Sequence, residues 1–214
     1  MADIIISGEI GWEVDTYDIR YQFSNIEPTK DIEISLSSPG GSVFQGVQIG
    51  HMIRDHIGKT TLTISALAAS MGSHISQNAD VIKVNDDTAW MMHNPWMYTS
   101  GDWRELDSDS KMLKSLAGML SVQYSKTSGQ KKEAILKLMD STTWLFGQEI
   151  VDAGFADELI TTENPESKED AIAFAKLQFT ECMAKLKTFE GAADDYKNVA
   201  ALLPDSKPTP AKSR

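Results

Sequence analysis

ALAASMGSHI, residues 66–75, contains one serine between a run of small apolar residues and a polar, helix-like stretch. Ser70 therefore stands where a strand is expected to end and a helix to begin. The free N–H groups and the dipole of a helix N-terminus stabilise negative charge at such a turn. With so little bulk around it, the hydroxyl suits a nucleophile, although a serine after two alanines is more often structural.

The composition describes a single acidic, globular chain. It has 214 residues, of which 41% are hydrophobic, enough for one sizeable core. The net charge of −11 argues against nucleic acid or an anionic membrane as the main partner, because both require a basic face. Cys182 is the single cysteine, so neither an intrachain disulfide nor a cysteine-based zinc site is expected. With no signal peptide and no apolar run near the roughly 18 residues of a membrane span, we expect a cytoplasmic protein without metal or cofactor.

Apolar runs alternate with helical patterns along the first 160 residues. Strands are expected at 4–6, 31–38, 61–67, 81–84 and 89–92, and helices at 12–26, 43–56, from Ser70, 107–126 and 131–139, with a short one before Gly154. This alternation predicts a mostly parallel sheet and an α/β fold over residues 1–160. Ser42 and Gln45 are expected to form a capping box for the 43–56 helix. Residues 161–214 are expected to be an appendage of linker, amphipathic helix and disordered tail.

A glycine turn provides a second candidate element. In SSPGGS, residues 37–42, Pro39 ends a strand and two glycines let the backbone approach a ligand closely. Taken alone, this pattern is more often an ordinary strand-to-helix turn. Beside a nucleophile, the N–H groups of Gly41 and Met71 could bind the oxyanion that forms during acyl transfer.

His93, in WMMHNP, is the third candidate. It follows an apolar strand, and Asn94-Pro95 forces an extended or turned exit. A histidine at a strand end can face a serine at a neighbouring strand end, as a rigid Ser–His pair requires. Single histidines in such positions are more often core residues. His74, one helical turn after Ser70, is a less suitable base.

The three motifs together are more specific than each alone. PGG, then AASMG about thirty residues later, then MMHNP about twenty-three residues after that, resembles the proteolytic subunit of the Clp protease family. The resemblance covers roughly 4–160, including VDAGFADEL, and is greatest to Clp-like head-maturation proteases of tailed phages and prophages. It implies a crotonase-like ββα superhelix with Ser70 as nucleophile, His93 as general base, and Gly41 and Met71 as the oxyanion hole. The helix at 107–126 would project for contacts in a homo-oligomeric ring.

The third member of the triad has more than one candidate. The family's aspartate falls about a dozen residues before the glycine that matches Gly154, and that spacing leads to Thr142. The nearest carboxylate is Asp140. Either Asp140 orients the imidazole, or Thr142 or a backbone carbonyl does so. We take Asp140 as the expected residue and keep Thr142 as the alternative.

The implied activity is that of a serine endopeptidase cleaving polypeptides in phage head maturation, with capsid or scaffold proteins as partners and the host cytoplasm as location. Only Met1, Ala2 and Asp3 precede the first expected strand, so a pore-lining segment and coupling to a Clp ATPase are not expected. Two alternatives are a crotonase-type acyl-CoA enzyme, since that fold also supplies two N–H groups to an oxyanion, and a catalytically silent assembly component.

Overall fold

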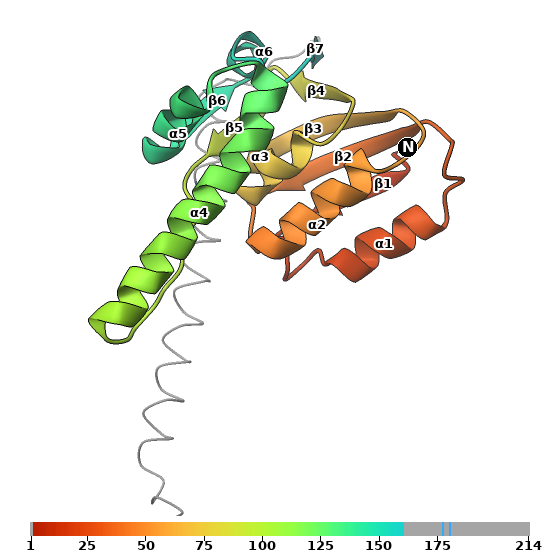
Figure 1. The fold of residues 1–214 in the computed structure, drawn as a ribbon. Coiled ribbons are helices and arrows are strands. Elements are labelled where there is room, and N and C mark those ends of the chain that lie inside the picture. Colours follow the sequence, from red (N-terminus) through yellow and green to blue (C-terminus); the bar gives the residue numbers. More distant parts are fainter. Residues whose placement is uncertain (1, 161–176, 178–179, 181–214) are drawn as a thin grey trace, which may run out of the picture.

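The computed structural model describes residues 2–160, 177 and 180 (Figure 1). Within these residues the strands are β1 (Ile4–Ser7), β2 (Ile32–Ser38), β3 (Thr60–Ala69), β4 (Val81–Asn85), β5 (Ala89–Met92), β6 (Thr143–Phe146) and β7 (Glu158–Ile160). The helices are α1 (Thr16–Ser24), α2 (Val43–Arg54), α3 (Met71–Ser76), α4 (Trp103–Ser128), α5 (Lys132–Asp140) and α6 (Gln148–Asp152). The appendage expected over 161–214 lies outside the described residues, apart from Leu177 and Thr180.

The strands of the described part form one sheet. Its main order is β1-β2-β3-β4-β7, and each of these neighbouring pairs is parallel. Strand β5 is parallel to β3, and β6 is antiparallel to β5. Parallel neighbours need long connections, and helices supply them here. The predicted α/β class with mostly parallel pairing is confirmed, whereas β6 was not predicted.

Strand β3 pairs with two different strands along its length. Residues 61–64 pair with β4, and residues 67–69 pair with β5. On the other side, an irregularity at the end of β2 brings Ser38 opposite Ala68. The carboxyl ends of β2, β3 and β5 therefore meet at one edge of the sheet. In open parallel sheets this edge is where ligands bind.

Helices α1, α2 and α3 lie side by side along the sheet (Figure 1). Strand β2 alternates as a half-buried strand should, with Ile34 and Leu36 among its buried residues. They join the buried Ile19 of α1 and Ile49 of α2 in one hydrophobic core. Helix α3 also packs closely on β2, because a Cβ at position 72 would lie 2.7 Å from the carbonyl oxygen of Ser38. Glycine at position 72 thus allows α3 its close contact with the sheet.

The ends of two helices differ from the sequence-based expectation. Helix α1 begins at Thr16 rather than residue 12, because the side chain of Asp15 caps it by accepting from the N–H of Tyr17 and Asp18. The capping box expected at α2 is wrong. Ser42 makes no side-chain capping hydrogen bond, and the Gln45 side chain accepts instead from the N–H of Thr16, which joins α2 to α1.

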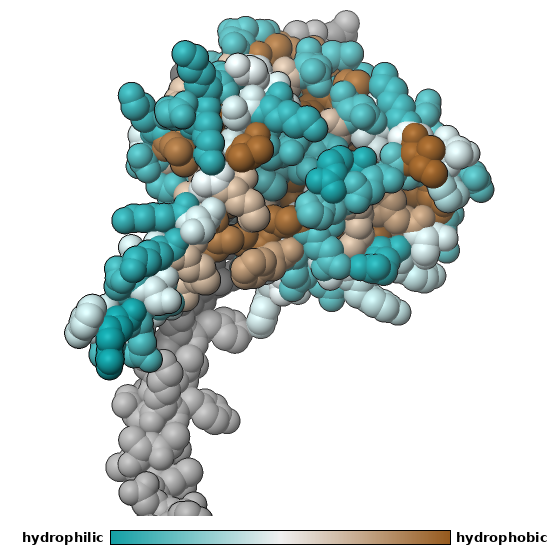
Figure 2. Space-filling view, viewed as in Figure 1, coloured by the Kyte–Doolittle hydropathy of each residue, from teal (hydrophilic) through white to brown (hydrophobic). Residues whose placement is uncertain are grey.

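Helix α4 projects from the body (Figure 1). It begins at Trp103, four residues before the expected start, behind a capping box formed by Asp102 and Glu105. Its buried residues, such as Ala117 and Tyr124, lie in its second half. Figure 2 shows hydrophobic side chains where α4 meets the body and mainly polar ones toward the projecting end. No helix in the described part combines the length and apolar character needed to cross a bilayer.

Candidate active site

Ser70 lies between β3 and α3 in a backbone conformation that is unusual for serine. Its φ is 53° and its ψ is −121°, outside the regions that L-residues normally occupy. Its N–H donates to the carbonyl of Met91 on β5, 2.9 Å away. Such strain persists only where the surrounding structure enforces it, and it is concentrated at functional sites. The turn therefore holds Ser70 beside the end of strand β5.

His93 follows the last residue of β5. Ala69 pairs with Met91, so the ends of β3 and β5 lie beside each other. Ser70 and His93, which follow these strands, therefore lie at the same edge of the sheet. The Nε2 atom of His93 is 2.8 Å from the Oγ atom of Ser70. Burial lowers the pKa of His93, which favours the neutral imidazole at neutral pH. A neutral ring can accept the serine proton.

The glycine turn passes directly over Ser70. A Cβ at Gly40 would lie 2.6 Å from the Cβ of Ser70 and 3.0 Å from the backbone nitrogen of Met71. Gly40 and Gly41 both have positive φ, 104° and 134°. The turn is held by Ile10, whose N–H donates to Gly40 and whose carbonyl accepts from Ser42. Side chains at the two glycines would collide with this frame, so the conformation requires glycine.

Met71 is the first residue of α3. The first N–H groups of a helix have no acceptor within it, so the N–H of Met71 is one of these orphan donors. The turn that contains Gly40 and Gly41 therefore passes close to both Ser70 and the backbone amide of Met71.

Asp140 and Thr142 both lie close to direct chain neighbours of His93. Asp140 ends α5 and accepts a hydrogen bond from the side chain of Asn94, the residue after His93, at 2.7 Å. Met92 pairs with Thr143 in the antiparallel β5–β6 ladder, so the next residues along the ladder are His93 and Thr142. Thr142 has a φ of 50°, which is strained for a β-branched residue. Folding therefore brings Asp140 to the residue after His93, and Thr142 next to the strand residue that pairs with the one before His93.

A cavity of about 590 Å³ lies beside the segment that follows His93. Its lining includes Asn94, Leu113, Leu136 and Asp140, from that segment, α4 and α5. The exposed lining is mainly apolar, although it includes the carboxylates of Asp109 and Asp140. A cavity of this size and character, lined by the residue that follows His93, can hold one side chain of a bound polypeptide.

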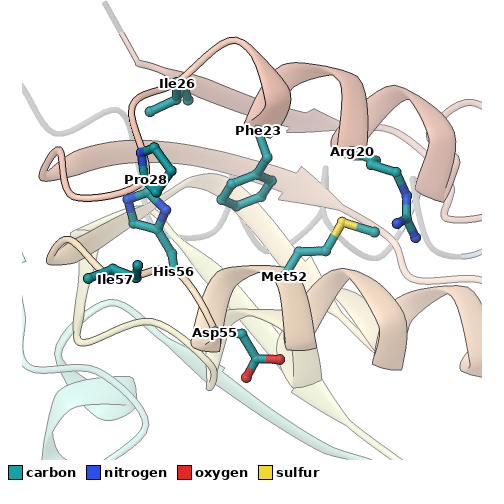
Figure 3. Close-up of a pocket in the computed structure, with 8 residues that line it drawn as sticks. All are labelled: Arg20, Phe23, Ile26, Pro28, Met52, Asp55, His56 and Ile57. Atoms are coloured by element: carbon teal, nitrogen blue, oxygen red, sulfur yellow. The ribbon is translucent and has the colours of Figure 1, made fainter.

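A smaller hollow of about 300 Å³ lies between α1 and α2. Figure 3 shows Phe23 of α1 and Met52 of α2 reaching into the space between the helices, with Pro28 and His56 at one end. The His56 ring also contacts the Lys30 carbonyl, 2.7 Å from Nε2. None of the residues lining this hollow belongs to the Ser70 site.

His74 is a buried residue of helix α3, one helical turn after Ser70. It is 7% exposed, and its ring packs edge-on against Tyr124 with centroids 5.6 Å apart. Burial, aided by the nearby His51, lowers the pKa of His74 to about 4. The hydroxyl of Ser70 bonds to His93 rather than to His74. His74 is thus a neutral core residue, in agreement with its ranking as the less suitable base.

The burial of His74 predicts a pH-dependent stability. The unfolded chain protonates this histidine near pH 6.5, whereas the folded chain does so only near pH 4. Between these values the unfolded state binds more protons, so the free energy of unfolding should fall by about 2 kcal/mol as the pH is lowered. Urea denaturation at pH 7.5 and 4.5 measures the change. The variant His74→Gln should show a smaller difference between the two pH values, and an equal drop in both proteins would contradict the assignment.

Two neighbours of the site were not identified from the sequence. The side chain of Asn94 donates a hydrogen bond to Asp140. Tyr124 lies next to the turn that contains Ser70, with its hydroxyl 2.8 Å from Ser73 Oγ. The position of Asn94 beside His93 was a usable signal, since an amide next to a catalytic histidine can hold a carboxylate. The sequence does not indicate a role for Tyr124 at the site, because its position fits the apolar stripe of a helix.

Comparison with known proteins finds one family. The model of the Clp protease family matches residues 2–163. The chain is 31% identical over 141 residues to "ATP-dependent Clp protease proteolytic subunit 1" of Protochlamydia amoebophila, covering 64% of this chain and 68% of that protein. It is 30% identical to the protein of the same name in Chlamydia abortus, covering 64% and 73%. It is 26% identical to "ATP-dependent Clp protease proteolytic subunit" of Streptococcus pneumoniae, covering 64% and 72%.

Proposed function

The chain belongs to the Clp protease family, and we propose that its peptidase chemistry is carried by Ser70 as nucleophile and His93 as general base. As a member of this family it is a serine-type peptidase, a hydrolase. The observation that carries the assignment is the 2.8 Å contact between Ser70 Oγ and His93 Nε2 at the ends of two adjacent parallel strands. A serine hydroxyl needs such a base, because it is a weak nucleophile while protonated.

The reaction follows from this arrangement. Ser70 Oγ attacks the carbonyl carbon of the scissile peptide bond while His93 Nε2 takes the hydroxyl proton. The carbonyl oxygen becomes an oxyanion, which the N–H groups of Gly41 and Met71 stabilise. The intermediate collapses as His93 returns the proton to the leaving amine, and an acyl-enzyme on Ser70 remains. Water, deprotonated by His93, then releases the acid and restores Ser70.

We assign the orienting role to Asp140. Its carboxylate accepts a hydrogen bond from the side chain of Asn94, the residue after His93, which keeps a negative charge beside the segment that carries the imidazole. A carboxylate in this role fixes the tautomer of the ring and stabilises the imidazolium that forms during attack. Thr142 is the alternative, supported by its place next to His93 along the β5–β6 ladder and by its strained backbone.

The substrate class is a polypeptide. The cavity beside Asn94 offers an apolar surface for a substrate side chain next to the bond to be cleaved. The test is incubation of the full chain with a fluorophosphonate, followed by peptide mapping. A covalent adduct on Ser70, together with hydrolysis of fluorogenic peptides, supports the proposal. An active peptidase whose adduct lies on another serine would overturn the assignment of the nucleophile.

We expect the protein to form a ring of several subunits. Helix α4 projects from the body and carries exposed apolar side chains beyond those that the body buries, among them Trp103, Leu106 and Met112. Exposed apolar surface on a projecting element is typical of a protein–protein interface. Light scattering of the full chain should give a mass several times the 23.6 kDa of one chain. A mass of one chain at all concentrations would contradict this expectation.

Three finer expectations come from the sequence analysis and go beyond the family assignment. They are action without ATP, a place in phage head maturation with capsid or scaffold proteins as partners, and location in the host cytoplasm. The named relatives are ATP-dependent proteolytic subunits, so the first of these needs a direct measurement. Degradation of an unfolded protein substrate without nucleotide or added ATPase would support it, and intact substrate beside active peptide hydrolysis would contradict it.

A further inference from the structure

We propose that Ser73 and Tyr124 are positioning residues that hold the strained backbone of Ser70 through a chain of hydrogen bonds. This inference rests on the proposed function, in which Ser70 is the nucleophile. The chain runs from α4 through α3 to the turn, and neither residue touches the substrate or the reacting atoms.

The contacts are short and buried. Ser73 Oγ donates to the carbonyl oxygen of Ser70 at 2.6 Å. The hydroxyl of Tyr124 lies 2.8 Å from Ser73 Oγ and 3.5 Å from the Ser70 carbonyl oxygen. Ser73 is fully buried and Tyr124 is 3% exposed. Hydrogen bonds removed from water in this way are stronger, and leaving one partner without the other is costly.

The direction of the protons follows from the number of donors. A serine hydroxyl has one proton, and that of Ser73 is directed at the Ser70 carbonyl. The proton in the pair between Ser73 and Tyr124 must therefore come from the tyrosine. Burial raises the pKa of Tyr124, so this hydroxyl remains a donor throughout the range in which a peptidase works. The order of donation is Tyr124 to Ser73 to Ser70.

The tyrosine is itself fixed in place. Its ring packs edge-on against His74, Trp90 and Phe155, with centroids 5.6, 5.8 and 6.2 Å apart. Edge-to-face packing among buried rings allows little movement of the hydroxyl. Tyr124 of helix α4 is thus a rigid hydrogen-bond partner for α3. Ser73 connects this tyrosine to the backbone carbonyl of Ser70.

Ser70 needs support at its carbonyl side. Its N–H is held by Met91 on β5, which fixes one side of the residue. On the other side the carbonyl accepts the first helical bond from the His74 N–H at 3.2 Å, and the shorter bond from Ser73. Because the φ and ψ of Ser70 are unfavourable, a loosened carbonyl would let the residue relax. Relaxation would move Oγ away from His93.

The test compares three single variants of the full chain, together with the double variant of Ser73 and Tyr124. Tyr124→Phe keeps the packed ring and removes the hydroxyl, and Ser73→Ala removes the middle of the chain. Ser76→Ala is the matched control, since Ser76 is also buried in α3 and donates to a carbonyl, that of Ser73, without contact to Ser70. Each variant is measured by the rate of fluorophosphonate labelling, by kcat and KM on a fluorogenic peptide, and by melting temperature.

Ser73→Ala and Tyr124→Phe should lower kcat and the labelling rate about 10- to 100-fold, the scale expected for small misplacement of a reacting group, with KM within about twofold. The double variant should be no slower than Ser73→Ala alone, because both changes interrupt one chain. Ser76→Ala should keep kcat near that of the unaltered protein whatever its melting temperature.

The failure of this inference differs from the failure of the proposed function. Normal kcat and labelling in Ser73→Ala or Tyr124→Phe, with the adduct still on Ser70 in the unaltered protein, overturns the positioning roles and leaves the nucleophile standing. An equal loss of kcat in Ser76→Ala overturns them too, because the effect would then follow general loosening of α3. Absence of an adduct on Ser70 in an active unaltered protein overturns both.

Discussion

Replacing Ser70 by alanine is expected to abolish peptide hydrolysis and fluorophosphonate labelling while the chain stays folded. Without Oγ no acyl-enzyme forms, and loss of the nucleophile in serine peptidases costs about 10⁶ in kcat. The fold should persist because the substitution removes only the Oγ atom and no apolar side chain of the core. The backbone of Ser70 is held through its N–H and carbonyl, which alanine retains.

The measurement is kcat on a fluorogenic peptide together with circular dichroism and melting temperature. Ser65→Ala is the matched control, because Ser65 lies on β3, the strand that leads to Ser70, and within the described residues its hydroxyl bonds to Ser35 and not to any site residue. That variant should keep full activity. Full activity in Ser70→Ala would instead mean that another residue is the nucleophile, and the assignment of His93 would fall with it.

Asp140→Asn is expected to lower turnover by about 10⁴, the cost of losing the orienting carboxylate in a catalytic triad. The substitution keeps the size of the side chain, and its amide oxygen can still accept from Asn94. What it loses is the negative charge, which in the proposed role of Asp140 stabilises the His93 imidazolium during attack. Stability should change little, so the loss should appear in kcat with an unchanged melting temperature.

Thr142→Val is the companion variant. It removes only a hydroxyl and keeps a β-branched side chain at the strained φ of 50°, so the backbone cost is unchanged. If Asp140 orients the base, this variant should lose about 1 kcal/mol or less of transition-state stabilisation, a few-fold in rate. An active Asp140→Asn beside an inactive Thr142→Val would show that the histidine is oriented by a neutral group at the position that family spacing indicates.

Several features of the fold were predictable because their signals are local. The alternation of apolar and polar residues correctly predicts strand β2. The apolar run before the turn at Ser70 correctly predicts strand β3. The start of α4 was placed too late because its capping box, Asp102 to Glu105, precedes the first apolar stripe. Strand β6 was missed because four residues with no alternation become a strand only when β5 lies beside them.

The sequence by itself determined the α/β class and the order of the three motifs, because the period of apolar residues and the conformational freedom of glycine act within a few neighbouring residues. It also marked Ser70 and His93 as ends of strands. Only the tertiary structure decided that these ends meet, since β3 continues past β4 to pair with β5. The same holds for Asp140 beside Asn94 and for Tyr124 beneath Ser73, 46 and 51 residues apart in the chain. Such contacts depend on how helices pack across the sheet, which no short stretch of sequence encodes.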